Sequence, residues 1–385
     1  MRFFSFRENA INQTNIARGI QALTANWIRE RDYDGEEADY IIMRIKSVLV
    51  GTKGWAEAHA KAYQACNRIE LVGVCGHADE ERLNSLADLY GIGHRSLQLS
   101  RLLQDTNPDV VDLTCSPDAR LELVKAAVRH PSVKLINIEK PLALTPSEAY
   151  EIADLCKSHH KLALVNHQHK YLPAWSKARN LLKDGAIGEV EYMRASTKVN
   201  IMEQGSHLID MVLFFNGFSP VSWVMGQAGP YEGKDSSPIV APDESMAALR
   251  FENGVRATIE CGAFARSIKG ETNPFYHIGI DVYGTAGHLK IALNQTLEVM
   301  NYNTGQHWTE KSSWEDSYMD AMVAYLESIE EYVRNPASGH ICDMDHAMLS
   351  FQVIMAVYHT AKYGGKIVLP HQFEDSIVER FESKE

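Results

Sequence analysis

Two short motifs place charged side chains where they could exchange a proton with a substrate. In Glu139-Lys140-Pro141 a lysine ends an apolar run, and its ammonium can donate to a substrate hydroxyl and polarise it. Glu203 and His207 lie four residues apart, so on one helix they would share a face. A carboxylate beside an imidazole orients the ring and raises its pKa, which makes a better general base. A surface ion pair before a turn and a structural histidine explain the same residues without catalysis.

A third polar group, His167-Gln-His169-Lys170-Tyr171, also follows an apolar run. The two histidines could ligate a metal, but no third ligand stands at a recognisable spacing, so we expect no metal site. A polar cluster at the mouth of a cleft is better suited to recognising a polyhydroxy substrate. Asp210 lies on an otherwise apolar segment, and we expect it to be a buried, hydrogen-bonded anchor rather than a catalyst.

A glycine turn is the candidate site for a dinucleotide. Gly51-Thr-Lys-Gly54-Trp-Ala56 follows an apolar run and precedes a helical pattern. Backbone N–H groups and a helix N-terminus at such a turn bind a pyrophosphate. In the fingerprint G-x-G-x-x-G/A, Gly51 fits the first position and Ala56 the third. Lys53 occupies the second, where the neighbouring Gly54 can supply the backbone freedom; a plain tight turn fits the same residues.

The end of the next apolar run bears on the choice of cofactor. Cys75-Gly76-His77 stands where a dinucleotide site usually carries an acid that binds the ribose hydroxyls. Asp79 comes slightly later and is suited to capping a helix that has Glu80 and Glu81 in its first turn. Without a carboxylate there is no repulsion against a 2′-phosphate, so NAD and NADP both fit.

The elements that must position these residues follow two patterns. From residue 45 to residue 166, short apolar runs alternate with helical patterns, which predicts a doubly wound parallel sheet covered by helices on both faces. Later strands come in neighbouring pairs with turn signals such as Asn253-Gly254, which predicts a large, open, mostly antiparallel sheet with helices on one face. The fold class is therefore α/β, with an N-terminal Rossmann sheet and a C-terminal α/β domain. The predicted parallel strands cover 45–50, 69–75, 110–114, 133–138 and 162–165.

We divide the chain into an extension over 1–42, a dinucleotide-binding domain over 43–165 and a substrate-binding and oligomerisation domain over 166–385. Residues 1–31 have apolar side chains at helical spacing, which predicts an amphipathic helix. The acidic run over 32–39 predicts a solvated link. The extension is either an arm that packs on another subunit or a disordered or wrongly assigned start.

Composition excludes several classes of protein. The chain has 385 residues and a formal net charge of −12, which argues against nucleic acid or an anionic membrane as the main partner. No apolar run approaches the ~18 residues of a membrane span, and we recognise no secretory signal. The six cysteines form no C-x-x-C pair, which favours free thiols in a cytoplasmic protein.

The motifs also occur in a familiar order. A Rossmann-like first strand, Glu139-Lys140-Pro141, Gly185-Ala-Ile-Gly-Glu-Val190 and Gly205-Ser-His207-Leu-Ile-Asp210 follow one another over about residues 43–370. In this the chain resembles the Gfo/Idh/MocA family of NAD(P)-dependent oxidoreductases, the glucose–fructose oxidoreductase and inositol dehydrogenase group. It departs from the family pattern at three positions. Lys53 replaces the second glycine of the turn, and Gly76 replaces the acid that binds the ribose. Glu203 replaces the usual aspartate.

The resemblance implies hydride transfer between NAD or NADP and a secondary alcohol of a sugar, cyclitol or glycoside. We also expect a homo-oligomer, dimer or tetramer, because one face of the second sheet has too few helices to cover it. Two alternatives stay open: a glycosidase that uses bound NAD for transient oxidation, and a non-catalytic sensor of sugar or dinucleotide. The implied catalytic residues are Lys140, His207 and Glu203. The candidate cofactor residues are Gly51, Thr52, Lys53, Gly54, Trp55, Gly76, His77, Ser116, Pro117, Glu139 and Lys140. The candidate substrate residues are His167, His169, Lys170 and Tyr171.

Overall fold

The computed structural model describes residues 27–31, 37–41, 44–233, 237 and 239–379. The chain forms two compact units, Met1–Arg44 and Ile45–Glu385. In the first unit, β1 (Trp27–Arg31) pairs antiparallel with β2 (Glu37–Ile41). The predicted helix is therefore wrong for Trp27–Arg31, and the predicted link over 32–39 is wrong for Glu37–Asp39, because both strands carry β-branched and aromatic residues that favour strands. The rest of these two predictions lies outside the described residues.

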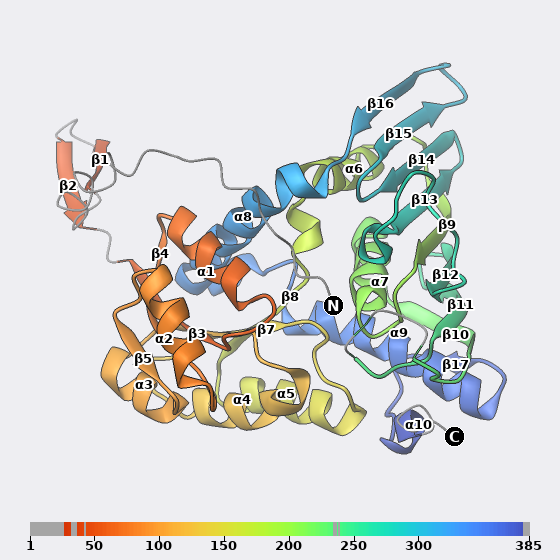
Figure 1. Ribbon diagram of the computed structural model, residues 1–385. Coiled ribbons are helices and arrows are strands. Elements are labelled where there is room, and N and C mark those ends of the chain that lie inside the picture. The colour runs from red at the N-terminus through yellow and green to blue at the C-terminus, as the bar shows by residue number, and fades with distance from the viewer. Residues whose placement is uncertain (1–26, 32–36, 42–43, 234–236, 238, 380–385) are drawn as a thin grey trace. The chain divides into compact units, whose positions relative to one another are not determined.

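The second unit begins with a six-stranded parallel sheet of order β5-β4-β3-β6-β7-β8 (Figure 1). Its central strands are buried along almost their whole length, as the continuous apolar runs predicted. The strands are β3 (Ile45–Val50), β4 (Ile69–Cys75), β5 (His94–Ser96), β6 (Val110–Leu113), β7 (Leu135–Glu139) and β8 (Leu162–Asn166).

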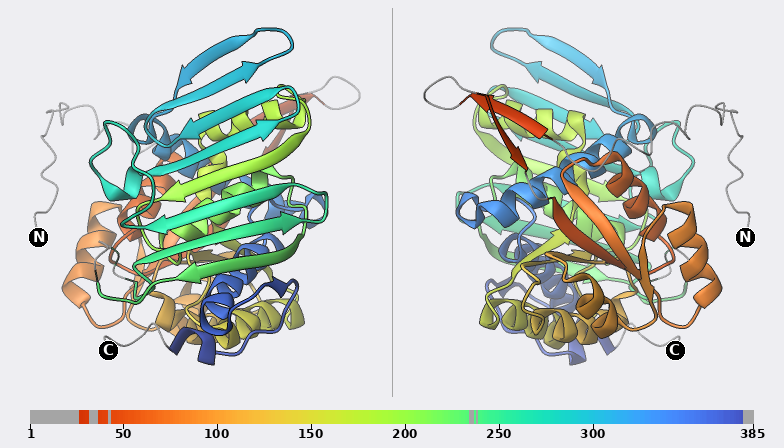
Figure 2. Two further views of the ribbon diagram at one scale, coloured as in Figure 1. Left: turned by 90° about the vertical axis from the view of Figure 1, so that its right-hand side faces the viewer. Right: turned by 90° about the vertical axis from the view of Figure 1, so that its left-hand side faces the viewer.

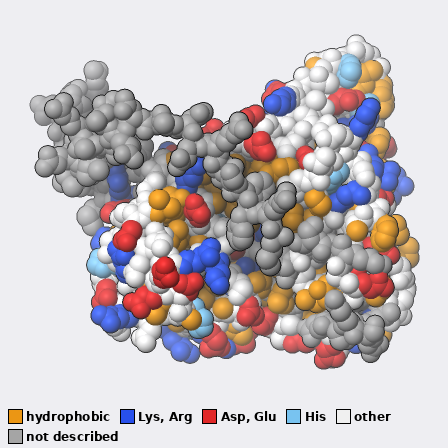
Figure 3. Space-filling view, in the orientation of Figure 1, with side chains coloured by type: hydrophobic (Ala, Val, Ile, Leu, Met, Phe, Trp, Pro, Cys, Tyr) orange, Lys and Arg blue, Asp and Glu red, His pale blue; other side chains and the backbone are white. Residues whose placement is uncertain are grey.

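Helices cover both faces of this sheet. The helices α3, α4 and α5 share one hydrophobic core with one face, while α1 and α2 pack on the other. On the side of the molecule seen in Figure 3, acidic and basic side chains intermingle over these helices. The helices are α1 (Ala56–Ala65), α2 (Glu80–Leu89), α3 (Leu99–Thr106), α4 (Arg120–Val128) and α5 (Pro146–Ser158), with a 3-10 turn, η2 (Pro117–Ala119), before α4.

The rest of the chain builds a nine-stranded sheet of order β16-β15-β14-β13-β9-β12-β11-β10-β17. Its pairs are antiparallel except for β9 and β12, which run parallel. The strands β10 and β16 were not predicted, because polar and small residues interrupt their apolar pattern. The strands are β9 (Val190–Thr197), β10 (Val221–Ala228), β11 (Glu244–Phe251), β12 (Arg256–Gly262), β13 (Ile278–Gly284), β14 (Gly287–Ala292), β15 (Thr296–Asn301), β16 (His307–Lys311) and β17 (Ile367–Val368).

Helices pack on one face of this sheet, and Figure 2 (left) shows the opposite face turned to the viewer. Among the described residues, no helix covers that opposite face, as predicted. The remaining elements are α6 (Pro173–Lys183), α7 (Gln204–Phe215), α8 (Trp314–Arg334), α9 (Met344–Tyr363), α10 (Ser376–Glu379), η3 (Gln168–Tyr171), η4 (Pro274–Tyr276) and η5 (Pro336–Ser338).

One of the two long C-terminal helices completes the core of the first sheet. Tyr325 and Ile329 of α8 are buried in the same cluster as Ile45 and Leu135 of the parallel strands. The Tyr325 hydroxyl donates to Asn137 Oδ1 at 2.5 Å. The core of the parallel sheet is therefore completed by residues far beyond position 165. The division of the chain at 165/166 stays a prediction.

Among the described residues, no helix combines the length and apolar character needed to cross a membrane. The six cysteines are all free thiols.

Candidate active site

The glycine turn leaves the carboxyl end of β3 with a backbone that only glycine adopts easily. Gly51 has a φ of +129°, and a Cβ atom there would lie 2.6 Å from Thr114 Oγ1. Gly54 has a φ of +58°, and a Cβ there would meet open space. Gly54 thus provides the conformational freedom that Lys53, in the second-glycine position, cannot. The turn leads directly into the N-terminus of α1, which is the arrangement that binds a pyrophosphate.

Two adjoining cavities of about 580 and 620 Å³ open at this edge of the sheet. They share wall residues, among them Lys53, Cys115 and Ser116, so the two cavities adjoin. We name them, by the roles that we expect of them, the adenosine lobe (about 580 Å³) and the reaction lobe (about 620 Å³). The adenosine lobe contains the predicted cofactor residues Gly51, Thr52, Lys53, Gly76, His77 and Ser116. The reaction lobe contains Lys53, Gly54, Trp55, Ser116, Pro117, Glu139 and Lys140.

The wall of the adenosine lobe near β4 has no acid in the predicted ribose position. A Cβ on Gly76 would lie 3.2 Å from Leu97 and 3.3 Å from Leu83, so this glycine is closely packed. Asp79 caps α2 and accepts a hydrogen bond from the backbone of Arg82 at 3.0 Å, which confirms its expected capping role. Arg82 Nε also donates to the Thr52 carbonyl at 2.7 Å and so ties α2 to the glycine turn.

In the reaction lobe, Lys140 Nζ forms a buried ion pair with the carboxylate of Glu203. The Lys140 and Glu203 side chains are 5% and 10% exposed. Each charge is therefore largely removed from water and is stabilised by the opposite charge beside it. The expected pairing of Glu203 with His207 is wrong. Glu203 precedes α7 with a non-helical backbone (φ −80°, ψ −85°), so the spacing rule for helical neighbours does not apply, and its carboxylate turns to the lysine instead.

His207 is buried behind the lobe, with its ring stacked on His169 at a centroid distance of 4.0 Å. Burial, followed by the nearby His169 and the charge of Lys140, holds the pKa of His207 well below its ordinary value. The prediction of an imidazole with a raised pKa is therefore wrong. We therefore expect His207 to be a neutral ring, and the wall formed by the described residues of the reaction lobe does not include it.

The predicted substrate residues form a buried cluster next to this ring. Lys170 Nζ lies 2.7 Å from Asp210 Oδ2, and His167 Nδ1 lies 3.1 Å from Asp210 Oδ1. Asp210 is thus the buried anchor that was expected. The Tyr171 hydroxyl lies 2.8 Å from Ser328 Oγ. The polar ends of Lys170 and Tyr171 are engaged inside the protein, so the prediction that they bind substrate is not supported.

Burial and the positive charge of Lys140 lower the pKa of His169 to about 3. The ring of His169 also meets Trp314 of α8 edge-on at 5.1 Å, and Trp314 in turn meets Trp55 at 6.3 Å. His167 and His169 therefore lie behind the described wall of the reaction lobe. For these two histidines, substrate contact stays a prediction.

Sequence reasoning missed Arg120, a fully buried side chain in the wall of the reaction lobe. Its guanidinium donates to the carbonyls of Pro141 and, at 3.1 Å, Cys115. It thereby joins the carboxyl ends of β6 and β7 beside Lys140. The available signal for Arg120 was a cationic residue four positions after Ser116. A charged residue near the start of a helix is more often exposed, so this signal did not indicate a buried side chain.

Comparison with known proteins agrees with this geometry. Residues 45–167 match the family described as "Oxidoreductase family, NAD-binding Rossmann fold", and residues 197–290 match the "GFO/IDH/MocA C-terminal domain". Together the matches cover more than half of the chain. The chain belongs to the Gfo/Idh/MocA family. It is thus an oxidoreductase with an NAD-binding Rossmann domain, as the sequence motifs had implied.

Curated relatives and solved structures extend over most of the chain. A D-apiose dehydrogenase of Paraburkholderia graminis is 22% identical over 85% of this chain and 90% of its own length. A D-glucoside 3-dehydrogenase of Escherichia coli is 23% identical over 84% of this chain and 97% of its own. A solved levoglucosan dehydrogenase in complex with NADH and levoglucosan has a TM-score of 0.73 at 18% identity, over 86% of this chain and all of that one. This structural likeness establishes the fold.

Proposed function

We propose that this Gfo/Idh/MocA oxidoreductase transfers a hydride between a nicotinamide dinucleotide and a secondary alcohol carbon of a sugar, cyclitol or glycoside. The observation that carries the proposal is the buried Lys140–Glu203 ion pair in the wall of the reaction lobe, next to the glycine turn. A pair of opposite charges at that place can hold a hydroxyl group and take its proton.

When bound, the dinucleotide supplies the acceptor or donor of the hydride. In the oxidation direction, Lys140 donates a hydrogen bond to the reacting oxygen and stabilises its developing negative charge. The O–H proton passes to the Lys140–Glu203 pair, in which the carboxylate is the base. The C–H bond breaks as the hydride leaves, and a C=O bond forms. In reduction the same pair returns the proton to the oxygen.

The relatives support a polyhydroxylated substrate. Their names describe enzymes of D-apiose, levoglucosan, D-glucosides and inositol. The reaction lobe combines charged groups with the rings of Trp55 and Phe275. Such a surface suits a sugar ring, which has polar edges and apolar C–H faces.

A substrate panel tests the proposal. The purified enzyme is incubated with NAD or NADP and a panel of aldoses, glycosides, anhydrosugars and cyclitols, and cofactor reduction is followed by absorbance. We expect reduction with at least one polyhydroxylated class and none with simple acids or aliphatic alcohols. Aglycone release without net cofactor change would instead identify an NAD-dependent glycosidase. Cofactor binding without turnover of any compound would favour a sensor.

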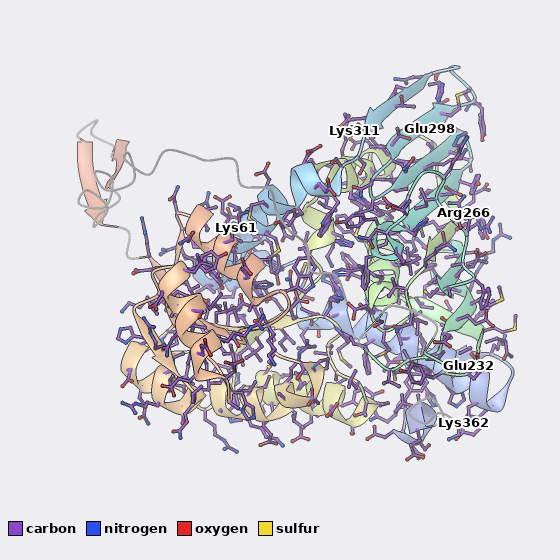
Figure 4. The ribbon with its side chains drawn as sticks, in the orientation of Figure 1. Lys61, Glu232, Arg266, Glu298, Lys311 and Lys362 are labelled. Carbon is purple, nitrogen blue, oxygen red and sulfur yellow. The ribbon has the colours of Figure 1, made fainter. Side chains whose placement is uncertain are left out.

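We also propose that the helix-free face of the nine-stranded sheet pairs with a second copy of this chain. Met225 and Met246 are 51% and 58% exposed on that face, and Phe264 is 71% exposed beside it. Arg266 and Glu298 lie on the same side of the sheet (Figure 4). Apolar side chains flanked by charges are typical of an interface between subunits.

The cellular location proposed for the enzyme is the cytoplasm. Its six cysteines are all free thiols, which suits a reducing compartment.

A further inference from the structure

A buried chain of polar groups runs beneath the reaction lobe, from β6 through α1 to β7. His59 of α1 is 1% exposed. Its Nδ1 lies 2.8 Å from Asp112 Oδ2, and its Nε2 lies 3.5 Å from Glu139 Oε1. Asn166, at the end of β8, donates from Nδ2 to the same Glu139 oxygen at 2.6 Å. Three strand ends and one helix thus meet at a single imidazole.

The two flanking carboxylates make His59 a cation. Burial opposes the charge, but Asp112 and Glu139 outweigh it and raise the pKa of His59 to about 10. Asn166 Nδ2 also lies 3.1 Å from His59 Nε2. A protonated imidazole has no lone pair there, so the amide donates to Glu139 only. Glu139 Oε1 therefore accepts a hydrogen bond from Asn166 and forms an ion pair with the imidazole of His59.

Glu139 itself lines the reaction lobe next to Lys140. Both contacts just described are made to Oε1 and restrict the rotation of the carboxylate, so we infer that Oε2 is the oxygen that faces the lobe. A buried carboxylate without these donors would rotate or take up a proton. The chain of groups thus holds the Glu139 carboxylate in one orientation and favours its charged form, in which it could accept a hydrogen bond from a bound cofactor.

His59 also lies on the helix that begins directly after the glycine turn. Its neighbour Lys61 is exposed on the outer side of α1 (Figure 4), whereas His59 is buried. We propose that His59 is a positioning residue that locks Glu139 and couples the pyrophosphate turn to the nicotinamide side of the cleft. The proposal rests on the NAD-binding role of the first sheet and not on the substrate class.

Paired substitutions at His59 separate its two contacts. Asparagine keeps an amide near the Nδ1 position and so keeps the contact with Asp112, whereas glutamine carries its amide to the Nε2 position, near Glu139. NADH affinity is measured by fluorescence titration of the full-length protein, and stability by thermal unfolding. We expect His59→Asn to weaken NADH binding on the order of tenfold, and His59→Gln to restore it to within about threefold.

Tyr63→Phe is the matched control. The Tyr63 hydroxyl donates to Asp112 Oδ2 at 3.0 Å from the same face of α1 and, among the described residues, makes no hydrogen bond to Glu139. This variant should lose stability while its NADH affinity stays within about twofold of the wild type. A purely structural network would instead lower affinity in step with stability in all three variants, and that result would overturn the proposal.

Asn166→Ala provides a second approach if His59→Asn does not fold, because it leaves the His59–Asp112 contact in place. We expect the same loss of NADH affinity, and no further loss when it is combined with a His59 substitution, because both residues act on one oxygen. Unchanged affinity in Asn166→Ala would contradict the proposal. Since the titration needs no substrate, its outcome is independent of which sugar the enzyme uses.

Discussion

Lys140 and Glu203, which lie at the end of β7 and just before α7, form an ion pair that is buried in the wall of the reaction lobe. One residue belongs to the parallel sheet and the other to the segment that precedes the second sheet's helix. The pair therefore exists only when both halves of the chain are folded and in contact. The proton transfer that we propose for this pair would therefore depend on that junction.

The first prediction concerns this pair. Lys140→Met and Glu203→Gln should each lower kcat on the order of 10²–10⁴-fold, because a general acid–base group is lost. The double variant should be no worse than the poorer single variant, since both groups act on one oxygen. NADH affinity should persist. Lys61→Met, on the exposed side of α1, is the control, and wild-type turnover in Lys140→Met would refute the assignment.

A second prediction separates His207 from catalysis by proton transfer. Because the pKa of His207 is held well below its ordinary value, its ring should stay neutral in nitrogen NMR spectra throughout the neutral range, with His207→Gln providing the assignment. His207→Gln should cost less than about tenfold in kcat/KM, which is below the range for a lost general base. A loss equal to that of Lys140→Met would return His207 to the role of base.

The sequence predicted the fold better than the site. The strand at Ile69–Cys75 has the predicted bounds, because continuous apolar runs are a direct consequence of burial on both faces. Lys140 was identifiable because a charged residue ended such a run. The partner of Glu203 was not, since a pairing between residues 63 positions apart depends on how the two sheets pack. His59 was missed for the same reason.

Stability should decline on both sides of neutral pH. In the acid direction, burial lowers the pKa of His169 to about 3 in the folded state. The unfolded state therefore binds the proton first, and the free energy of unfolding decreases as the pH falls below ~6.5. In the alkaline direction, the pKa of His59 is raised to about 10 in the folded state. The charged ring therefore stabilises the fold fully below pH ~6.5, and this stabilisation is lost as the pH rises from there toward about 10.

Urea unfolding at several pH values measures this profile. His169→Gln should flatten its acid side, and His59→Gln its alkaline side. If either variant left the corresponding slope unchanged, the charge assigned to that ring would be incorrect.

Cofactor choice should respond to a carboxylate at the end of β4. Gly76 is too closely packed against Leu83 and Leu97 for a clean substitution, whereas His77 is exposed and lines the adenosine lobe. His77→Asp should raise the preference for NAD over NADP about tenfold, because the carboxylate repels a 2′-phosphate. His77→Asn controls for loss of the ring. An unchanged ratio of kcat/KM values would place the ribose elsewhere.

The helix-free sheet face should hold two copies together. Met225→Asp combined with Met246→Asp places charges on the exposed face and should yield a monomer in sedimentation velocity runs. Leu89→Asp, at a side chain 66% exposed on α2, adds a charge elsewhere and should leave assembly unchanged. A wild-type protein that sediments as a monomer at micromolar concentration would exclude the interface.

The parallel pairing of β9 with β12 has a consequence for how the chain folds. The strands β10–β12 form one meander and β13–β16 another, each from sequence neighbours. The earlier strand β9 lies between them and bonds to both. Neighbouring strands pair quickly, whereas closing long loops slows folding. We therefore expect each meander to form first and the insertion of β9 to be the slow event that joins them. Until it occurs, β12 and β13 expose open edges, and the newly made chain is most prone to aggregation.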